Sequence, residues 1–232
     1  MRKVENAVKS VSGDGRAPSI VLEALQQDQS VAAQELLALA PQAKLRSGAV
    51  RSVSAFPNAR ILVVEEGFVI LRGTDPAPGR GVVICHGGAG TFLPFIAPSH
   101  DIVALVDSRV TVITVDIYEQ LLELPGAAQA LLRGIEATVR QKQRTILALA
   151  SSHHVDRLRE KLLQLAEDHG RVGRDGVVLK LPVTHELLAE MIGSTRETVT
   201  RAVDALERDG FLRRQGREYV LRVSPGALER QK

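Results

Sequence analysis

The fold of the C-terminal third of this chain is decided by residues 184–209, which read THELLAEMIGSTRETVTRAVDALERD. Thr184 is a good N-cap for a first helix, and Gly193 can supply the positive φ that a tight turn between helices needs. Ser194 or Thr195 then caps a second helix, which ends at 209–210. Each helix has one apolar face, made by Leu187, Leu188, Met191 and Ile192 in the first and by Val199, Ala202, Val203 and Leu206 in the second.

Residues 211–221 follow this pair of helices and contain Gly216 at a predicted turn, which indicates a short β-hairpin. Two helices joined by a short glycine-containing turn and followed by a hairpin form a winged helix-turn-helix. The sequence therefore predicts that this domain places its second helix in the major groove of double-stranded DNA.

The first turns of the second helix expose Arg196, Glu197, Thr200 and Arg201. Arginine can donate two hydrogen bonds to guanine O6 and N7, and glutamate can accept one from cytosine N4. The simpler alternative is that Glu197 and Arg201 form an ordinary i,i+4 surface pair. That alternative leaves Arg196 at the helix start without an explanation, so we favour base recognition.

Other side chains of this segment are predicted to contact the DNA backbone. The hydroxyls of Thr184, Ser194 and Thr195 lie at helix N-termini, where phosphates bind readily. The hairpin over residues 211–221, called the wing, would contact phosphates through Arg213, Arg214 and Arg217. The alternative is a hairpin that only faces solvent.

The N-terminal half changes to short β-branched runs separated by turns, which favours an antiparallel β-sandwich or barrel over residues 42–116. Residues 1–17 are polar and predict a flexible arm, and short helices are expected between 19 and 39. The predicted fold class is α+β. The predicted domains are the arm, a β-domain with flanking helices (18–116), a short and a long helix (117–152), and the winged helix-turn-helix domain (153–232).

A short helix over 117–124 precedes a long one over 126–151, which carries apolar residues at steps of 3, 4, 7 and 3. This heptad-like seam predicts a self-paired coiled coil, with a lysine at one position. A helix packed only on its own domain is the alternative. The predicted dimer interface consists of Leu132, Ile135, Val139, Lys142, Ile146 and Leu149.

Residues 193–201, GSTRETVTR, resemble the G-[CS]-S-R-E-T-V-x-R signature of the CRP/FNR superfamily of transcription regulators. The order of β-roll, long dimer helix, hinge and winged helix also agrees with that family. The resemblance implies a homodimer that binds a palindromic operator with GTGA-type half-sites, with RNA polymerase as a further partner. It covers residues 155–222 strongly, the long helix fairly and the β-domain weakly.

The sensor half departs from the family's cyclic-nucleotide-binding members. In those members a Gly-Glu pair binds the ribose of the nucleotide, and a later Arg-Ser pair neutralises its cyclic phosphate. Here Pro94-Phe95 stands at the first pair of positions and Ser99-His100 at the second. The sequence has no arginine between Arg80 and Arg109. A buried phosphate without a guanidinium would be left uncompensated, so we do not expect cyclic AMP to bind in the family's manner. The positions that would reach an effector are Phe95, Ser99, His100, Lys142 and Gln143.

The sequence offers few residues that could hold the other cofactors of this family. An iron-sulfur cluster needs several cysteines, whereas Cys85 is the only one in the sequence. Cys85-His86 could offer an axial ligand to haem, but a buried cysteine beside a surface histidine is the simpler interpretation. We predict no metal site, and the effector is either unknown or absent, in which case the β-roll serves for dimerisation or protein contact.

Composition narrows the function classes. The chain has 232 residues, a formal charge of +3 and a pI near 9.2, which suit nucleic-acid binding without requiring it. Motifs for a nucleophile elbow, a P-loop or a zinc protease are absent from the sequence, so an enzyme is not expected. No signal peptide or membrane span is predicted, which favours the cytoplasm. The alternative function is a ligand-sensing or structural dimer whose C-terminal helices bind a protein partner instead of DNA.

Overall fold

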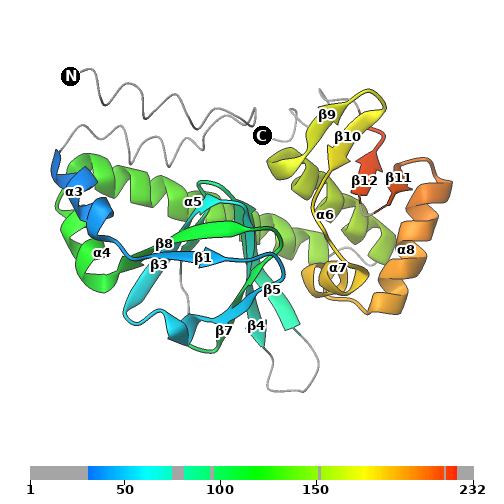
Figure 1. The fold of residues 1–232 in the computed structure, drawn as a ribbon. Coiled ribbons are helices and arrows are strands. Elements are labelled where there is room, and N and C mark those ends of the chain that lie inside the picture. Colours follow the sequence, from blue (N-terminus) through cyan, green and yellow to red (C-terminus); the bar gives the residue numbers. More distant parts are fainter. Residues whose placement is uncertain (1–30, 75–80, 95–96, 151–152, 217, 224–232) are drawn as a thin grey trace.

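The computed structural model describes residues 31–74, 81–94, 97–150, 153–216 and 218–223 (Figure 1). Several predicted features lie outside these ranges: the arm over 1–17, the first part of the helical segment before residue 31, and the side chains of Phe95 and Arg217. Within the described ranges, no helix is both long and apolar enough to cross a membrane.

The N-terminal half is a roll of two four-stranded antiparallel sheets, as the short β-branched runs predicted. One sheet has the order β1-β8-β3-β6 and the other the order β2-β7-β4-β5. A 3-10 turn, η1, spans Val53–Ala55. The strands are β1 (Gln42–Leu45), β2 (Val50–Ser52), β3 (Ala59–Glu66), β4 (Phe68–Thr74), β5 (Gly81–Gly88), β6 (Phe92–Pro94), β7 (His100–Ala104) and β8 (Ser108–Thr114). An apolar core fills the space between the sheets; it includes Leu62, Val69, Leu93, Ile102 and Val110.

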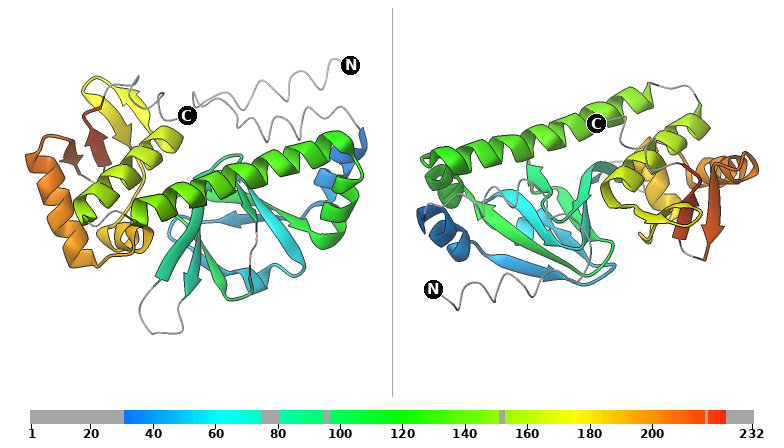
Figure 2. Two further views of the ribbon diagram at one scale, coloured as in Figure 1. Left: turned by 180° about the vertical axis from the view of Figure 1, so that it is seen from behind. Right: turned by 90° about the horizontal axis from the view of Figure 1, so that it is seen from above.

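In the part of the chain that the structure describes, three helices close one side of the roll. They are α3 (Val31–Leu39), α4 (Val115–Leu122) and the 25-residue α5 (Pro125–Leu149). The Thr114 side chain caps α4, and Pro125 stands at the first position of α5, where its missing N–H costs nothing. Gly134 lets α5 approach β6 closely, because a Cβ at that position would lie 2.7 Å from Cγ of Phe92. Figure 2 shows α5 running along the whole roll and on to the C-terminal domain.

Over its described residues, 153–216 and 218–223, the C-terminal domain contains three helices and one four-stranded sheet of order β11-β12-β10-β9. The elements are α6 (His154–His169), β9 (Arg171–Gly173), β10 (Gly176–Leu179), α7 (His185–Ile192), α8 (Arg196–Arg208), β11 (Leu212–Gln215) and β12 (Glu218–Leu221). The hairpin β9–β10 was not predicted from the sequence. The observed α+β class, with a β-roll, a long helix and a winged helix-turn-helix, confirms the predicted fold class.

The two halves share one apolar core. Phe68, Ile70 and Val83 of the roll belong to the same buried cluster as Leu165 and Leu188 of the C-terminal domain. An ion-pair contact of 3.7 Å between Arg72 of β4 and Glu190 of α7 crosses the same boundary. The hairpin β4–β5 is therefore the surface of the roll on which the C-terminal domain rests.

Candidate nucleic-acid interface

The turn between α7 and α8 has the geometry that its residues predicted. Thr184 accepts a hydrogen bond from the Leu187 backbone N–H at 3.1 Å and so begins α7. Gly193 ends α7 with φ 61° and ψ 50°, a left-handed conformation that favours glycine. Thr195 accepts from the Thr198 backbone N–H at 3.3 Å and begins α8. These local signals fix the angle at which α8 leaves the turn.

The buried face of α8 holds the helix against the domain and determines which residues face outward. Val199, Ala202, Val203 and Leu206 are all buried, whereas Arg196, Glu197 and Arg201 are exposed. Figures 1 and 2 show α8 at the outer edge of the molecule, away from the roll. The three side chains that sequence analysis assigned to base recognition therefore share one open face.

The exposed charges of α8 interact with one another without a close contact. Among the residues that the structure describes, no ion pair within 4 Å joins Glu197 to Arg196 or Arg201, although both arginines act on the Glu197 carboxylate through space. Hydrogen bonds from its own backbone N–H and from the Thr195 hydroxyl lower the pKa of Glu197, and both arginines lower it further. Glu197 therefore stays a carboxylate and can accept hydrogen bonds.

Besides the two capping hydroxyls of Thr184 and Thr195, the other two predicted hydroxyls contact histidines. The Thr200 hydroxyl donates to the Arg196 carbonyl oxygen at 2.9 Å and lies 2.9 Å from Nδ1 of His185. Ser194 Oγ lies 3.2 Å from Nδ1 of His154, the first residue of α6. These two histidines were not predicted to take part in the interface. No local signal indicated them, because each contact joins residues at least 15 positions apart.

The wing brings arginines beside α8, but acidic groups partner them. Arg213 reaches Asp175 in the β9–β10 turn at 3.2 Å. Arg214 contacts Glu207 at 2.7 Å and Asp204 at 3.0 Å, and these bonds raise its pKa. A cavity of about 440 Å³ separates the start of α7 from the wing, and Thr184 and Arg214 line it.

The predicted dimer seam of α5 lies largely on the surface of the single chain. Leu132, Val139, Ile146 and Leu149 are exposed, by 67% in the case of Ile146. Ile135 and Lys142 are partly buried. An apolar stripe on a helix of this length exposes a large hydrocarbon area to water, which is unusual for a surface without a partner.

The predicted effector positions are only partly brought together. Lys142 lies close enough to His100 to lower the pKa of that imidazole, although burial is the larger cause. His100 Nδ1 accepts from the Ala97 backbone N–H at 3.1 Å. Ser99 and Gln143 are exposed.

The structure corrects one expectation about the Cys85-His86 pair. Cys85 is buried, and burial raises the pKa of its thiol to about 12, so its side chain is a neutral thiol at neutral pH. His86 was expected at the surface, but only 2% of it is exposed. The reason is tertiary: β5 is covered by α6, so His86 points into the junction between the two halves.

Comparison with known proteins agrees with this geometry. Residues 156–231 match the Crp-like helix-turn-helix domain family. The chain is 35% identical over 111 residues to the global nitrogen regulator of Synechococcus elongatus, covering 48% of this chain and 50% of that protein. It is 34% identical over 99 residues to the transcriptional activator protein FnrL of Cereibacter sphaeroides, covering 43% and 36%. The chain thus spans about half or less of the length of these curated relatives, which are named as a regulator and as a transcriptional activator.

Solved structures match over most of the chain. A mutant of CooA from Carboxydothermus hydrogenoformans superposes with a TM-score of 0.71 at 20% identity, covering 91% of this chain and 94% of that one. FixK2 from Bradyrhizobium japonicum gives a TM-score of 0.68 at 21% identity, covering 83% and 96%. At these identities the likeness concerns the fold, which agrees in both halves.

Proposed function

We propose that this chain, whose residues 156–231 match the Crp-like helix-turn-helix domain family, is a homodimeric transcription regulator of the CRP/FNR type that reads a palindromic DNA site with α8. The observation that carries the proposal is the open face of Arg196, Glu197 and Arg201 on the first two turns of α8. Unpaired charges on a helix whose other face is buried are available to a ligand of matching chemistry, and base edges in the major groove have it.

The side chains of this face suit a GTGA-type half-site. Arg201 would bind guanine O6 and N7, and Glu197 would accept from cytosine N4 on the opposite strand. Arg196, at the helix start, would be shared between a base and a phosphate. Since the pKa of Glu197 is already lowered, DNA binding requires no change in its protonation.

Phosphate contacts would fix the register of the helix. The exposed hydroxyls of Thr184 and Thr195 stand at the N-termini of α7 and α8, where backbone N–H groups favour an anion. Arg213 would turn from Asp175 to a phosphate. Ser194 and Thr200 are better suited to holding α8 in place, because their hydroxyls already bond to histidines.

Dimerisation would use the exposed seam of α5. Two copies packed along this seam bury its apolar residues and relate the two α8 helices by a two-fold axis. Half-sites would then recur one helical turn apart, about 34 Å. RNA polymerase is the further partner expected of such a regulator, and the cytoplasm is its expected location.

The effector is proposed to differ from cyclic AMP held in the family's manner. The roll places His100 and Lys142 near each other, and the sequence supplies no arginine there for a buried phosphate. The alternative function is a dimer whose α7 and α8 bind a protein. Its prediction differs in one respect: the affinity for duplex DNA would be absent or insensitive to salt.

The experiment is a fluorescence anisotropy titration of labelled duplexes that contain the proposed site or a mismatched one. Arg201→Ala should raise Kd for the matched site by the equivalent of about 1–3 kcal/mol and leave the mismatched Kd nearly unchanged. Arg208→Ala, at the far end of the same helix, is the matched control and should bind like the wild type. Equal losses on both duplexes would contradict base recognition. A log Kd independent of log salt would favour a protein partner.

A further inference from the structure

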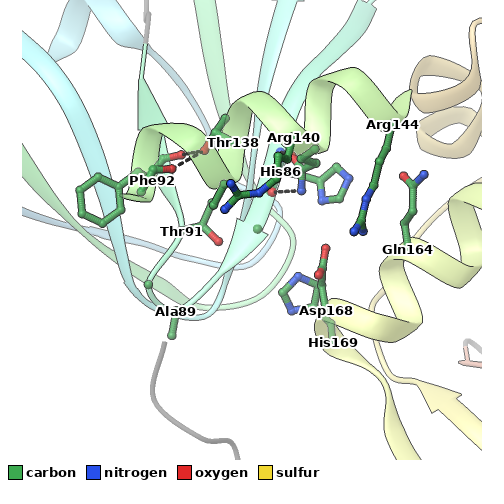
Figure 3. A pocket seen from close by; sticks show the side chains of 15 residues that line it. His86, Ala89, Thr91, Phe92, Thr138, Arg140, Arg144, Gln164, Asp168 and His169 are labelled. Carbon is green, nitrogen blue, oxygen red and sulfur yellow. Dashed lines mark hydrogen bonds between the residues drawn. The ribbon is translucent and has the colours of Figure 1, made fainter. Parts of the chain in front are cut away.

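A second cavity lies where the two halves of the chain meet, and the function proposed above does not use it. Its volume is about 320 Å³, and it is bounded by the β5–β6 turn, by α5 and by α6 (Figure 3). The residues that line it include His86, Arg140, Gln141, Arg144, Gln164 and Asp168. None of the effector positions expected from the sequence and described by the structure lines this cavity. It is therefore a separate place from the interior of the roll.

His86 is a buried polar group that lacks a partner. Neither ring nitrogen has a hydrogen bond to any residue that the structure describes, although the ring is stacked 5.8 Å from Phe68. The backbone of His86 is fixed by Gln141, whose Nε2 donates to the His86 carbonyl oxygen at 3.0 Å. Burial lowers the pKa of His86, and Lys161 and His169 lower it further, so the ring is neutral. A neutral imidazole has one donor and one acceptor, and leaving both unsatisfied in the interior is unfavourable.

The α5 wall of the cavity carries two arginines. Arg140 and Arg144 stand one helical turn apart on α5, and Figure 3 shows Arg144 extending across the space toward α6. Arg140 is 3.7 Å from Glu136, and Arg144 is 3.4 Å from Glu167, so each also has an acidic neighbour.

A buried ammonium group stands behind the α6 wall. Lys161, 2% exposed, donates to Gln164 Oε1 at 2.9 Å and to Thr145 Oγ1 at 3.1 Å. Both of these acceptors are neutral oxygens. Among the described residues, Arg140, Arg144 and Lys161 have four carboxylates near them, those of Glu136, Glu160, Glu167 and Asp168. An anionic ligand is therefore favoured by the two guanidinium groups that line the cavity and not by its net charge.

We propose that this cavity binds a small organic molecule whose carboxylate or phosphate group contacts Arg140 and Arg144 and whose polar body forms a hydrogen bond with His86. Guanidinium groups match the geometry of both oxyanions. A volume near 300 Å³ lies at the small end of ligand pockets, which suits a metabolite and excludes a dinucleotide.

Occupancy of this cavity would act on the position of the DNA-binding helices, a consequence that rests on the proposed function. The β5–β6 turn and α5 belong to the sensor half, whereas α6 packs against both α7 and α8. The contact is close: a Cβ at Gly88 would lie 2.9 Å from Cε1 of His169. A ligand that bridges α5 and α6 would stabilise one orientation of α6 and therefore one orientation of α8.

The test measures thermal unfolding and isothermal titration of the full-length protein with inorganic phosphate and, separately, malonate, at matched ionic strength in chloride. At least one anion should raise Tm, and Arg144→Gln should weaken its binding about tenfold or more. Arg133→Gln, on the same helix but outside the cavity, should bind as the wild type does. Ala137→Leu fills the cavity from an exposed helix position and should also abolish the shift.

A shift with phosphate alone identifies a phosphorylated ligand, and a shift with malonate alone identifies a carboxylate. No shift with either anion, or an equal loss in Arg133→Gln and Arg144→Gln, overturns the site. These measurements contain no DNA, so a failure of the proposed function would leave them intact. Anion binding that leaves the Kd for DNA unchanged would overturn only the coupling to α8.

Discussion

Lys161 offers a quantitative test of how the two halves of the chain are joined. Its ammonium is buried between α5 and α6, and burial lowers its pKa from 10.5 to about 8, opposed in part by Asp168 and Glu160. At 1.36 kcal/mol per pH unit, this lowering corresponds to about 3 kcal/mol of unfavourable charging in the folded state. Below pH 8 lysine is protonated in both states, so this penalty is fully present at neutral pH.

Between pH 8 and 10.5 the folded protein releases the Lys161 proton while the unfolded chain retains it. The unfolded state then binds more protons, so the free energy of unfolding rises with pH through this window. Lys161→Met removes the titration. The wild type should therefore gain about 3 kcal/mol relative to this variant between pH 7 and 10.5. At pH 7 the variant should be the more stable protein by about 1 kcal/mol or more, after the loss of two hydrogen bonds.

The assay is urea denaturation followed by circular dichroism, with both proteins measured at each pH from 7 to 10.5. Cys85 and Tyr219, whose pKa values are raised by burial, also titrate at alkaline pH, but they cancel in the difference between the two proteins. Lys180→Met removes a lysine from an exposed position and serves as the control. A stability difference for Lys161→Met that does not change with pH, or that matches the control, would refute the burial of this charge.

Three other variants test the packing and the assembly. Gly134→Ala should destabilise the protein by about 1–3 kcal/mol in chemical denaturation, because the new Cβ would clash with Phe92. Alanine has the better helix propensity, so a gain in stability would contradict the close approach of α5 to β6. Ile135→Glu with Val139→Glu should give monomers with weak operator binding, and an intact dimer in analytical ultracentrifugation would remove the α5 seam as the interface. Thr195→Ala should cost about 1 kcal/mol of stability through the lost α8 cap, whereas an unchanged unfolding midpoint would show that the cap is dispensable.

The helix-turn-helix could be predicted from the sequence because its signals are local. A capping threonine, a glycine at the turn and apolar residues at helical spacing all act within a few residues of one another. The strands of the roll were also predicted, since β-branched runs between turns favour them. The pairing of the strands could not be predicted, because it joins distant parts of the chain. For example, β1 (Gln42–Leu45) pairs with β8, which lies more than 60 residues further along.

The junction between the halves could not be predicted for the same reason. The sequence places His86 in a strand near turn glycines, where a histidine is commonly exposed. His86 is buried because α6 packs across β5. The residues around position 86 give no indication that this strand lies beside His169 of α6. The hairpin β9–β10 does carry a local signal, because Asp175-Gly176 at its turn is a dipeptide typical of turns.

Selection of duplexes from a random pool tests the central claim about α8 most directly. The wild-type protein should enrich two-fold symmetric sequences with GTGA-type half-sites about one helical turn apart, and Arg201→Ala should lose preference at one base pair of each half-site. Enrichment of no sequence, or the same enriched sequence from both proteins, would contradict the reading of bases by Arg196, Glu197 and Arg201.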